Sequence, residues 1–146
     1  MPEQAEGTIT VAATPREIMV VLGDFEAYPE WVGSMERVQV LRRDRRGRGS
    51  RVAFELSTPV LGASYTLDYA YAPRDAGMSW TYVEGTLGDL AGSYTLEPSA
   101  DGGGTLVTYR LRVELNMPLP GLVKRQAARQ ISRSALQDLK RRVEAG

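Results

Sequence analysis

The sequence predicts an α+β fold in which a seven-stranded, strongly curved antiparallel sheet wraps around a long C-terminal helix, with two short helices after the first strand. Segments with apolar residues at alternate positions follow one another from residue 34 to residue 114, as in a meander of strands. Apolar residues at three- and four-residue steps over about 120–144 indicate one long amphipathic helix. Helix-start signals directly after an early strand complete the pattern.

The first strand and first helix are predicted by their local signals. Residues 8–13 alternate between apolar and polar positions, which is typical of a strand. Thr14 is a suitable N-cap, Pro15 suits the first helical position, and Glu17 lies three residues beyond the cap. These residues predict a capping box at the start of a short helix over 15–23.

A second short helix is expected over Phe25–Trp31, with Asp24 as its candidate cap. Its aromatic residues Phe25, Tyr28 and Trp31 allow two interpretations. They form a structural plug that closes one end of the curved sheet, or they gate the mouth of an internal cavity.

The remaining strands are separated by short segments rich in glycine, proline and aspartate. The predicted strands are Arg37–Arg45, Arg51–Val60, Tyr65–Tyr71, Met78–Glu84, Leu90–Glu97 and Thr105–Glu114, with turns at Arg46–Gly49 and Leu61–Gly62. The apolar stripe of the long helix is predicted from Leu122, Val123, Ala127, Ile131, Ala135, Leu139 and Val143. Because one long helix must cover a large sheet, the sheet is expected to curve around it and leave space between them.

Composition excludes several classes of protein. The length of 146 residues predicts a single domain over 1–146. The absence of cysteine and histidine excludes disulfide frameworks, thiolate and imidazole metal ligands, and serine–histidine triads. We therefore expect no metal site and no cofactor. The acidic N-terminus lacks the apolar core of a secretory signal, so a cytoplasmic location is expected.

The formal net charge of zero hides two basic segments. Residues 42–51 contain six arginines, and residues 120–146 contain seven basic and two acidic residues. The segment Arg42–Arg51, which we call the arginine hairpin, is interpreted either as a solvated hairpin or as a contact for an anionic membrane surface or a ribosome. It lacks interleaved aromatic residues, and no specific DNA binding is expected.

Several motifs point to one family. The stretch Thr8–Val32 holds a strand, a small-residue-x-Pro helix start and a Tyr-Pro-x-Trp element, and Gly92-x-Tyr94-x-Leu96 and Thr105–Leu111 fit later strands. Across essentially the whole chain, this pattern resembles the START-like (SRPBCC) superfamily, the polyketide cyclase/dehydrase and lipid-transport group. The subfamily that it resembles most includes coenzyme-Q-binding and ribosome-association toxin-like proteins. The resemblance implies a helix-grip fold with a hydrophobic ligand cavity, and it transfers no catalytic residue to this chain.

Tyrosines on the predicted strands are the main candidates for ligand contacts. Each has an apolar ring and a hydroxyl that needs a partner when buried, although tyrosine also favours strands for packing alone. The candidate ligand-binding residues are Tyr65, Leu67, Tyr69, Trp80, Tyr82, Tyr94, Tyr109, Leu111 and Ile131.

Glu84 is the one weak candidate for catalysis. It shares the alternation of Trp80 and Tyr82, whereas the other charged strand residues lie out of phase with their apolar neighbours. A carboxylate turned into an apolar cavity would have a raised pKa and could act as an acid or base.

Three functions remain open from the sequence. The first is non-enzymatic binding of a hydrophobic small molecule, such as a lipid, an isoprenoid quinone or a polyketide, between the sheet and the C-terminal helix. The second is an aromatase/cyclase-type enzyme acting on a polyketide. The third is docking on a ribosome or a membrane. The missing histidine favours binding, because it leaves only Glu84 and the tyrosines as candidate catalytic groups.

Overall fold

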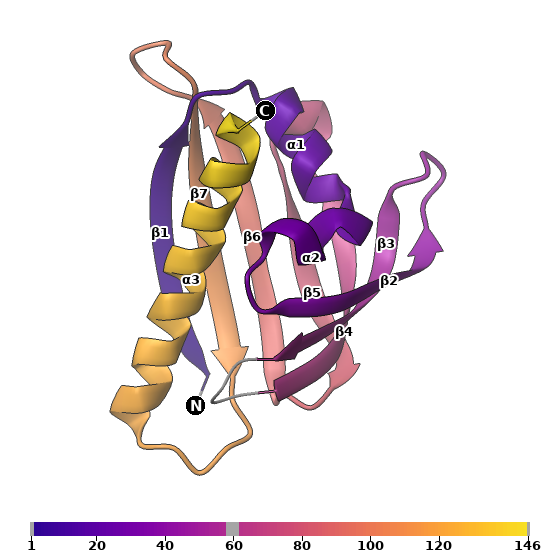
Figure 1. Ribbon diagram of the computed structural model, residues 1–146, viewed down its shortest axis with the longest axis vertical. Coiled ribbons are helices and arrows are strands. Elements are labelled where there is room, and N and C mark those ends of the chain that lie inside the picture. The colour runs from indigo at the N-terminus through magenta and orange to yellow at the C-terminus, as the bar shows by residue number, and fades with distance from the viewer. Residues whose placement is uncertain (1, 58–61, 146) are drawn as a thin grey trace.

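The computed structural model describes residues 2–57 and 62–145, which form one sheet covered by helices on a single side (Figure 1). The strands of this seven-stranded sheet are β1 (Glu3–Val11), β2 (Met35–Arg43), β3 (Gly49–Ser57), β4 (Gly62–Tyr71), β5 (Gly77–Gly85), β6 (Asp89–Pro98) and β7 (Thr105–Glu114). They lie in the order β1-β7-β6-β5-β4-β3-β2, and every neighbouring pair is antiparallel. The predicted α+β architecture is confirmed.

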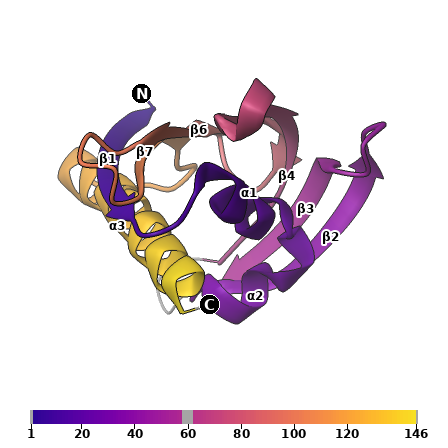
Figure 2. The ribbon, with the colours of Figure 1, turned by 90° about the horizontal axis from the view of Figure 1, so that it is seen from above.

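The sheet curves strongly, so that β1 and β7 stand on one side of the molecule and β2 and β3 on the other (Figure 2). The long helix α3 (Gly121–Glu144) packs on the concave side against β1 and β7. The short helices α1 (Pro15–Gly23) and α2 (Tyr28–Trp31) lie at one end of this concave side. Helical elements therefore cover the β1 edge and one end of the concave side.

The N-terminal signals are confirmed in atomic detail. Thr14 accepts a hydrogen bond from the backbone N–H of Glu17, and the Glu17 carboxylate accepts one from the backbone N–H of Thr14. This capping box starts α1 at Pro15, as predicted. The expected second helix is a 3₁₀ turn, η1 (Phe25–Ala27), followed by the single turn of α2, and the side chain of Asp24 makes no capping hydrogen bond.

Strand positions follow the predicted alternation, with changes at the ends. The first strand begins at Glu3 instead of residue 8. The reason is that residues 3–7 also pair with β7, so the ladder runs from Glu3–Val113 to Val11–Thr105. The predicted turn at Leu61–Gly62 lies partly outside the described residues, and Gly62 itself begins β4. The last strand matches its prediction.

The buried stripe of α3 matches the prediction only in part: Leu139 is buried, and Ala127, Ala135 and Val143 pack against the core. The buried residues of this helix are Ala128, Ser132, Leu136 and Leu139, whereas Leu122, Val123 and Ile131 are exposed. The reason is close packing on β1: a Cβ on Gly7 would lie only 3.0 Å from Leu136 Cδ1 and 3.2 Å from Ser132 Oγ. Small residues allow the helix to approach the strand this closely. A search for large apolar residues at helical spacing does not find these small residues. No helix within the described ranges is long and apolar enough to cross a membrane.

Replacing Gly92 with alanine tests how tightly the concave side is packed. A Cβ at Gly92 would lie 2.5 Å from both the Arg110 carbonyl oxygen and Trp80 Cζ2, so the backbone or the indole must move. We expect Gly92→Ala to lower the free energy of unfolding by about 1–3 kcal/mol in urea denaturation. Gly33→Ala is the matched control, because nothing lies within 4 Å of its added methyl group. Equal stabilities of the two variants would contradict this packing.

Candidate functional site

The candidate site is the concave side of the sheet, where strand register brings aromatic residues together. Tyr69 pairs with Trp80 across β4 and β5, and Tyr94 pairs with Tyr109 across β6 and β7. Gly92 lies opposite Trp80 and leaves room for its indole ring. Four neighbouring strands thus place large rings on the face that the sheet curves around.

These rings form one continuous network from α2 to β7. Trp31 contacts Tyr28, which contacts Phe25, with ring centroids 5.0 and 5.2 Å apart. The network continues from Phe25 to Tyr69 at 4.7 Å and from there to Trp80 at 5.9 Å.

It ends on β6 and β7, where the ring centroids of Tyr94 and Tyr109 lie 4.9 Å apart and both rings contact Trp80. A branch through Phe54 reaches Tyr65 at 5.4 Å. Tilted and edge-to-face contacts of this kind are the favourable geometry for aromatic side chains.

Three tyrosine hydroxyls are committed to the fold. Tyr28 donates to the Leu22 carbonyl oxygen at 2.6 Å, and this bond ties η1 and α2 to the end of α1. Tyr71 donates to the Gly49 carbonyl oxygen at 2.6 Å, and Tyr82 donates to the Leu87 carbonyl oxygen at 2.9 Å. These hydroxyls hold neighbouring segments of the chain together.

Four other hydroxyls have no hydrogen-bond partner among the described residues. We call Tyr65, Tyr69, Tyr94 and Tyr109 the tyrosine cluster, and none of the four makes a hydrogen bond with any part of the chain that the structure describes. Tyr94 and Tyr109 are only 8% and 6% exposed. No side-chain oxygen among the described residues is both sealed from solvent and unpartnered, so each of these hydroxyls still borders space that a water-sized molecule can enter. The concave side therefore presents free hydroxyls inside a ring-lined interior.

Burial sets the ionisation of the cluster. It raises the pKa of Tyr65, and it raises the pKa of Tyr69, Tyr94 and Tyr109, with a further increase from neighbouring tyrosines. Burial is the physical cause because an anionic phenolate loses its hydration in this interior. At neutral pH these groups are uncharged phenols that donate and accept hydrogen bonds and do not act as bases.

The candidate ligand-binding residues divide by burial. Leu67, Trp80, Tyr94, Tyr109 and Leu111 are buried, and Tyr65, Tyr69 and Tyr82 are partly buried against the core. Ile131 is 37% exposed, so its predicted place within the packed interface is wrong. It lies on the same side of α3 as Asp138 and Arg142. Asp138 accepts a hydrogen bond from the backbone N–H of Gly33, just after α2, and Arg142 pairs with Glu30 within α2.

The predicted inward orientation of Glu84 is wrong. Thr66 pairs with Glu84 and Leu67 pairs with Tyr82, so Val83 is the extra residue of a β-bulge. An extra residue reverses the alternation of a strand. Glu84 is consequently exposed on the convex side, where its charge helps to raise the pKa of Arg51.

Phe54 is a contributor that the sequence reasoning did not include among the candidates. It is 3% exposed and contacts Tyr65, Tyr69, Phe25 and Tyr28. Its alternation with Val52 on β3 is the signal that indicates its face.

The plug interpretation of the short helices is supported by the burial of Phe25 and Tyr28. Phe25 lies so close to β3 that a Cβ on Gly49 would approach its ring to 2.8 Å. Trp31 instead lines a surface groove of about 370 Å³ between α1, α2 and the end of α3, together with Val20 and Arg142.

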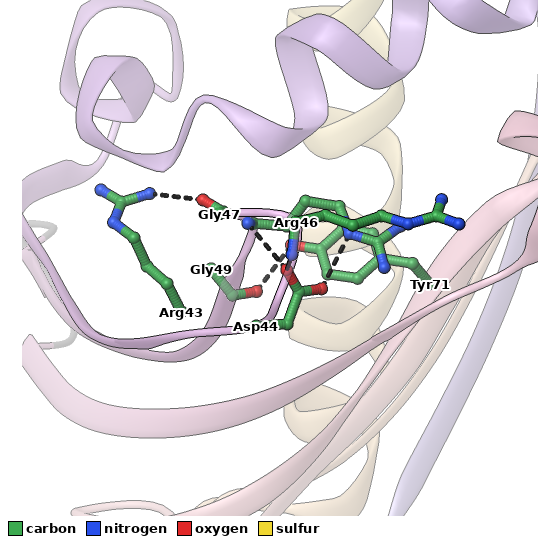
Figure 3. Close-up of polar contacts among 7 residues, drawn as sticks. Arg43, Asp44, Arg46, Gly47, Gly49 and Tyr71 are labelled. Carbon is green, nitrogen blue, oxygen red and sulfur yellow. Dashed lines mark hydrogen bonds and ion pairs between the residues drawn. The ribbon is translucent and has the colours of Figure 1, made fainter.

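The arginine hairpin is organised largely by contacts within the protein (Figure 3). Asp44 accepts hydrogen bonds from the backbone N–H groups of Arg46 and Arg48 and from Arg48 Nε. The Arg48 guanidinium lies 4.3 Å from the centre of the Tyr71 ring, a cation–π contact. Arg43 pairs with Glu26 at 3.0 Å.

At the base of the hairpin, Arg51 donates two hydrogen bonds to Asp68, at 2.7 and 2.9 Å. Arg42, Arg45 and Arg46 are exposed and form no ion pair with any described residue. Half of the six arginines therefore stabilise the hairpin and its neighbours.

The curved sheet, the long helix on its concave side and the short helices after β1 define the helix-grip class of proteins, also called the START fold. The chain belongs to the polyketide cyclase/dehydrase and lipid transport family, whose pattern matches residues 11–140. No curated protein matches the chain at a significant level.

Solved structures share this fold at low sequence identity. A START superfamily protein from Mycobacterium smegmatis aligns with a TM-score of 0.87 and 23% identity over 97% of both chains. The Zhui aromatase/cyclase from Streptomyces sp. R1128 aligns with a TM-score of 0.76 and 17% identity over 99% of this chain and 94% of its own. A STAR-related lipid transfer protein fragment from Xanthomonas axonopodis aligns with a TM-score of 0.75 and 18% identity over 97% and 85%.

Alkaline pH should destabilise the protein through its buried phenols. Free tyrosine ionises near pH 10.0, whereas burial raises the pKa of Tyr71 to about 12, although Arg48 opposes the shift, and burial also raises that of Tyr28 and of the tyrosine cluster. Between these pH values the unfolded chain loses protons that the folded chain keeps, so stability falls as pH rises.

We expect the free energy of unfolding, measured in urea, to show no tyrosine-dependent change from neutral pH to about pH 10 and to decline above it. Tyr94→Phe should show a shallower decline, because it removes one of the shifted groups. Ionisation of all the tyrosines of the folded protein near pH 10, followed by tyrosinate absorbance, would contradict this assignment.

Proposed function

We propose that this protein binds a hydrophobic small molecule on the concave side of its sheet, without chemical conversion. The observation that carries the proposal is the tyrosine cluster: four hydroxyls without protein partners border accessible space within a network of aromatic rings. Polar groups inside a protein normally have a protein or water partner, so the unpartnered hydroxyls of the tyrosine cluster call for an explanation. A bound molecule would supply the missing partners, while its apolar surface leaves water.

The family supports a hydrophobic ligand and leaves its identity open. The matched description includes both lipid transport and polyketide conversion, and the similar structures include a lipid transfer protein and an aromatase/cyclase. Within the range that we inferred, a lipid, an isoprenoid quinone or a polyketide, the free hydroxyls favour a ligand that carries oxygen.

The alternative, an aromatase/cyclase-type reaction, is weakened by the positions of the acidic side chains. Glu84 is on the convex side, and no described aspartate or glutamate is buried. The tyrosines alone remain as acids for such chemistry. Turnover of a poly-β-ketone that is lost in Tyr94→Phe or Tyr109→Phe would establish the alternative.

We also propose the finer relationship to the coenzyme-Q-binding and ribosome-association toxin-like subfamily, which the N-terminal element over Thr8–Val32 supports. Any contact with a ribosome or an anionic membrane would use Arg42, Arg45 and Arg46, since these arginines are exposed and unpaired within the described structure. Co-sedimentation with ribosomes or anionic vesicles that is absent, or that survives replacement of all three by glutamine, would remove this part of the proposal.

The binding proposal is tested with the uncharged fluorescent probe N-phenyl-1-naphthylamine. We expect saturable fluorescence enhancement with the protein and at least about a tenfold loss of affinity in Leu111→Trp, because the added ring occupies the concave side beside Gly92. Leu41→Trp is the control, since Leu41 is 49% exposed on β2.

Thermal unfolding of both variants checks that the fold is retained. Leu67→Trp provides a second substitution on the same face if Leu111→Trp fails to fold, because Leu67 pairs with Tyr82 on β5. Absence of saturable binding to the unmodified protein would reject the proposed function.

A further inference from the structure

We propose that the ligand is an uncharged aromatic or polycyclic molecule with at least two hydrogen-bonding oxygens, and that the tyrosine cluster selects it against charged molecules of the same shape. The inference rests on the proposed binding function and specifies the chemistry of its ligand. It is carried by two observations: the distribution of charge around the concave side and the arrangement of the free hydroxyls.

The interior offers no counter-ion for a charged ligand. The buried polar or charged residues of the described chain are Thr66, Thr105, Thr108 and Ser132, and no arginine, lysine, aspartate or glutamate is among them. A fatty acid carboxylate, phosphate or sulfonate held there would be a desolvated anion without a partner, which is strongly unfavourable.

The charged groups that shift the pKa values of Tyr28 and Tyr94 are carboxylates. Asp24 raises the pKa of Tyr28 and Asp138 raises that of Tyr94, in both cases after the larger effect of burial. Asp138 lies on α3 with its side chain only 18% exposed. These carboxylates further disfavour an anion on the concave side. They also do not form a strong cation site, because Asp138 is already paired with Arg141 at 3.4 Å.

The four free hydroxyls come from three strands of the concave side. Tyr94 and Tyr109 belong to one register pair of β6 and β7 and lie 4.9 Å apart by ring centroids. Tyr65 and Tyr69 lie on β4, which β5 separates from β6 in the sheet. A ligand that supplies partners to hydroxyls of both β4 and the β6–β7 pair needs more than one oxygen, and its apolar or aromatic surface would lie against Trp80.

Each hydroxyl of the cluster is both a donor and an acceptor, so a carbonyl, a phenol or an alcohol of the ligand fits equally well. A purely hydrocarbon ligand would leave all four hydroxyls unsatisfied and would bind more weakly than an oxygenated one of the same size.

The test compares four probes with the same ring system by isothermal titration calorimetry at neutral pH. They are naphthalene-2,7-diol, 2-methylnaphthalene, 2-naphthoate and the ammonium form of 2-naphthylmethylamine. We expect the diol to bind at least about tenfold more tightly than 2-methylnaphthalene, because it satisfies the hydroxyls. We expect both ions to bind at least about 100-fold more weakly than the diol, because their charge is buried without a partner.

Matched variants link this preference to the tyrosine cluster. Tyr94→Phe and Tyr109→Phe should each weaken binding of the diol about tenfold and leave that of 2-methylnaphthalene unchanged. Tyr71→Phe is the control: the Tyr71 hydroxyl is bonded to the Gly49 carbonyl oxygen, and diol affinity should be unchanged. Because the hydroxyls of Tyr94 and Tyr109 hold no other residue, both cluster variants should unfold at temperatures no lower than the unmodified protein.

The outcomes separate this inference from the proposed function. If N-phenyl-1-naphthylamine binds but either ion matches the diol, or if both cluster variants keep full affinity for the diol, the selectivity proposed here is wrong and hydrophobic binding stands. If N-phenyl-1-naphthylamine and all four naphthalene probes fail to bind, both proposals fail together.

Discussion

The close contact of α3 with β1 is the constraint on which the rest of the structure depends. Gly7 on the strand and small side chains on the helix let the two backbones approach, so the only long helix of the described chain lies along one side of the sheet. Five strands, β2 to β6, therefore lack a long helix as cover. Curvature and large side chains must shield most of the apolar surface on their concave side from water, and tyrosine, tryptophan and phenylalanine meet that need because each ring buries a large apolar area.

This arrangement explains why the fold could be predicted and the site only in part. Alternation identified the face of Tyr94, Tyr109 and Leu111, because each lies in a strand without a bulge near it. It failed at Glu84, where one inserted residue reverses the parity of the strand. Nothing in the local sequence marks Val83 as a bulge, since the irregularity arises from the pairing of β5 with β4.

The helix shows a different limit of sequence reasoning. A stripe of large apolar residues normally identifies the buried face of a helix, and this rule selected Leu122, Val123 and Ile131. The buried face instead contains Ala128 and Ser132. The helix packs against a strand, which approaches it closely at Gly7, and not against another helix. The hydroxyl partners of Tyr28, Tyr71 and Tyr82 were also beyond prediction, since their acceptors are carbonyl groups of distant or irregular segments.

The bulge at Val83 has a consequence for how this fold can change. The bulge keeps the carboxylate of Glu84, only two residues beyond Tyr82 on the same strand, away from the concave side, which holds uncharged phenols. Deletion of Val83 would leave Glu84 opposite Thr66 and still on the convex side, whereas pairing of Val83 with Thr66 would move Glu84 opposite Tyr65 and direct its carboxylate toward the aromatic rings. In evolutionary terms, a binding protein and a protein with an acid–base group in its interior differ here by a one-residue shift in the pairing of two strands, with no new residue type required.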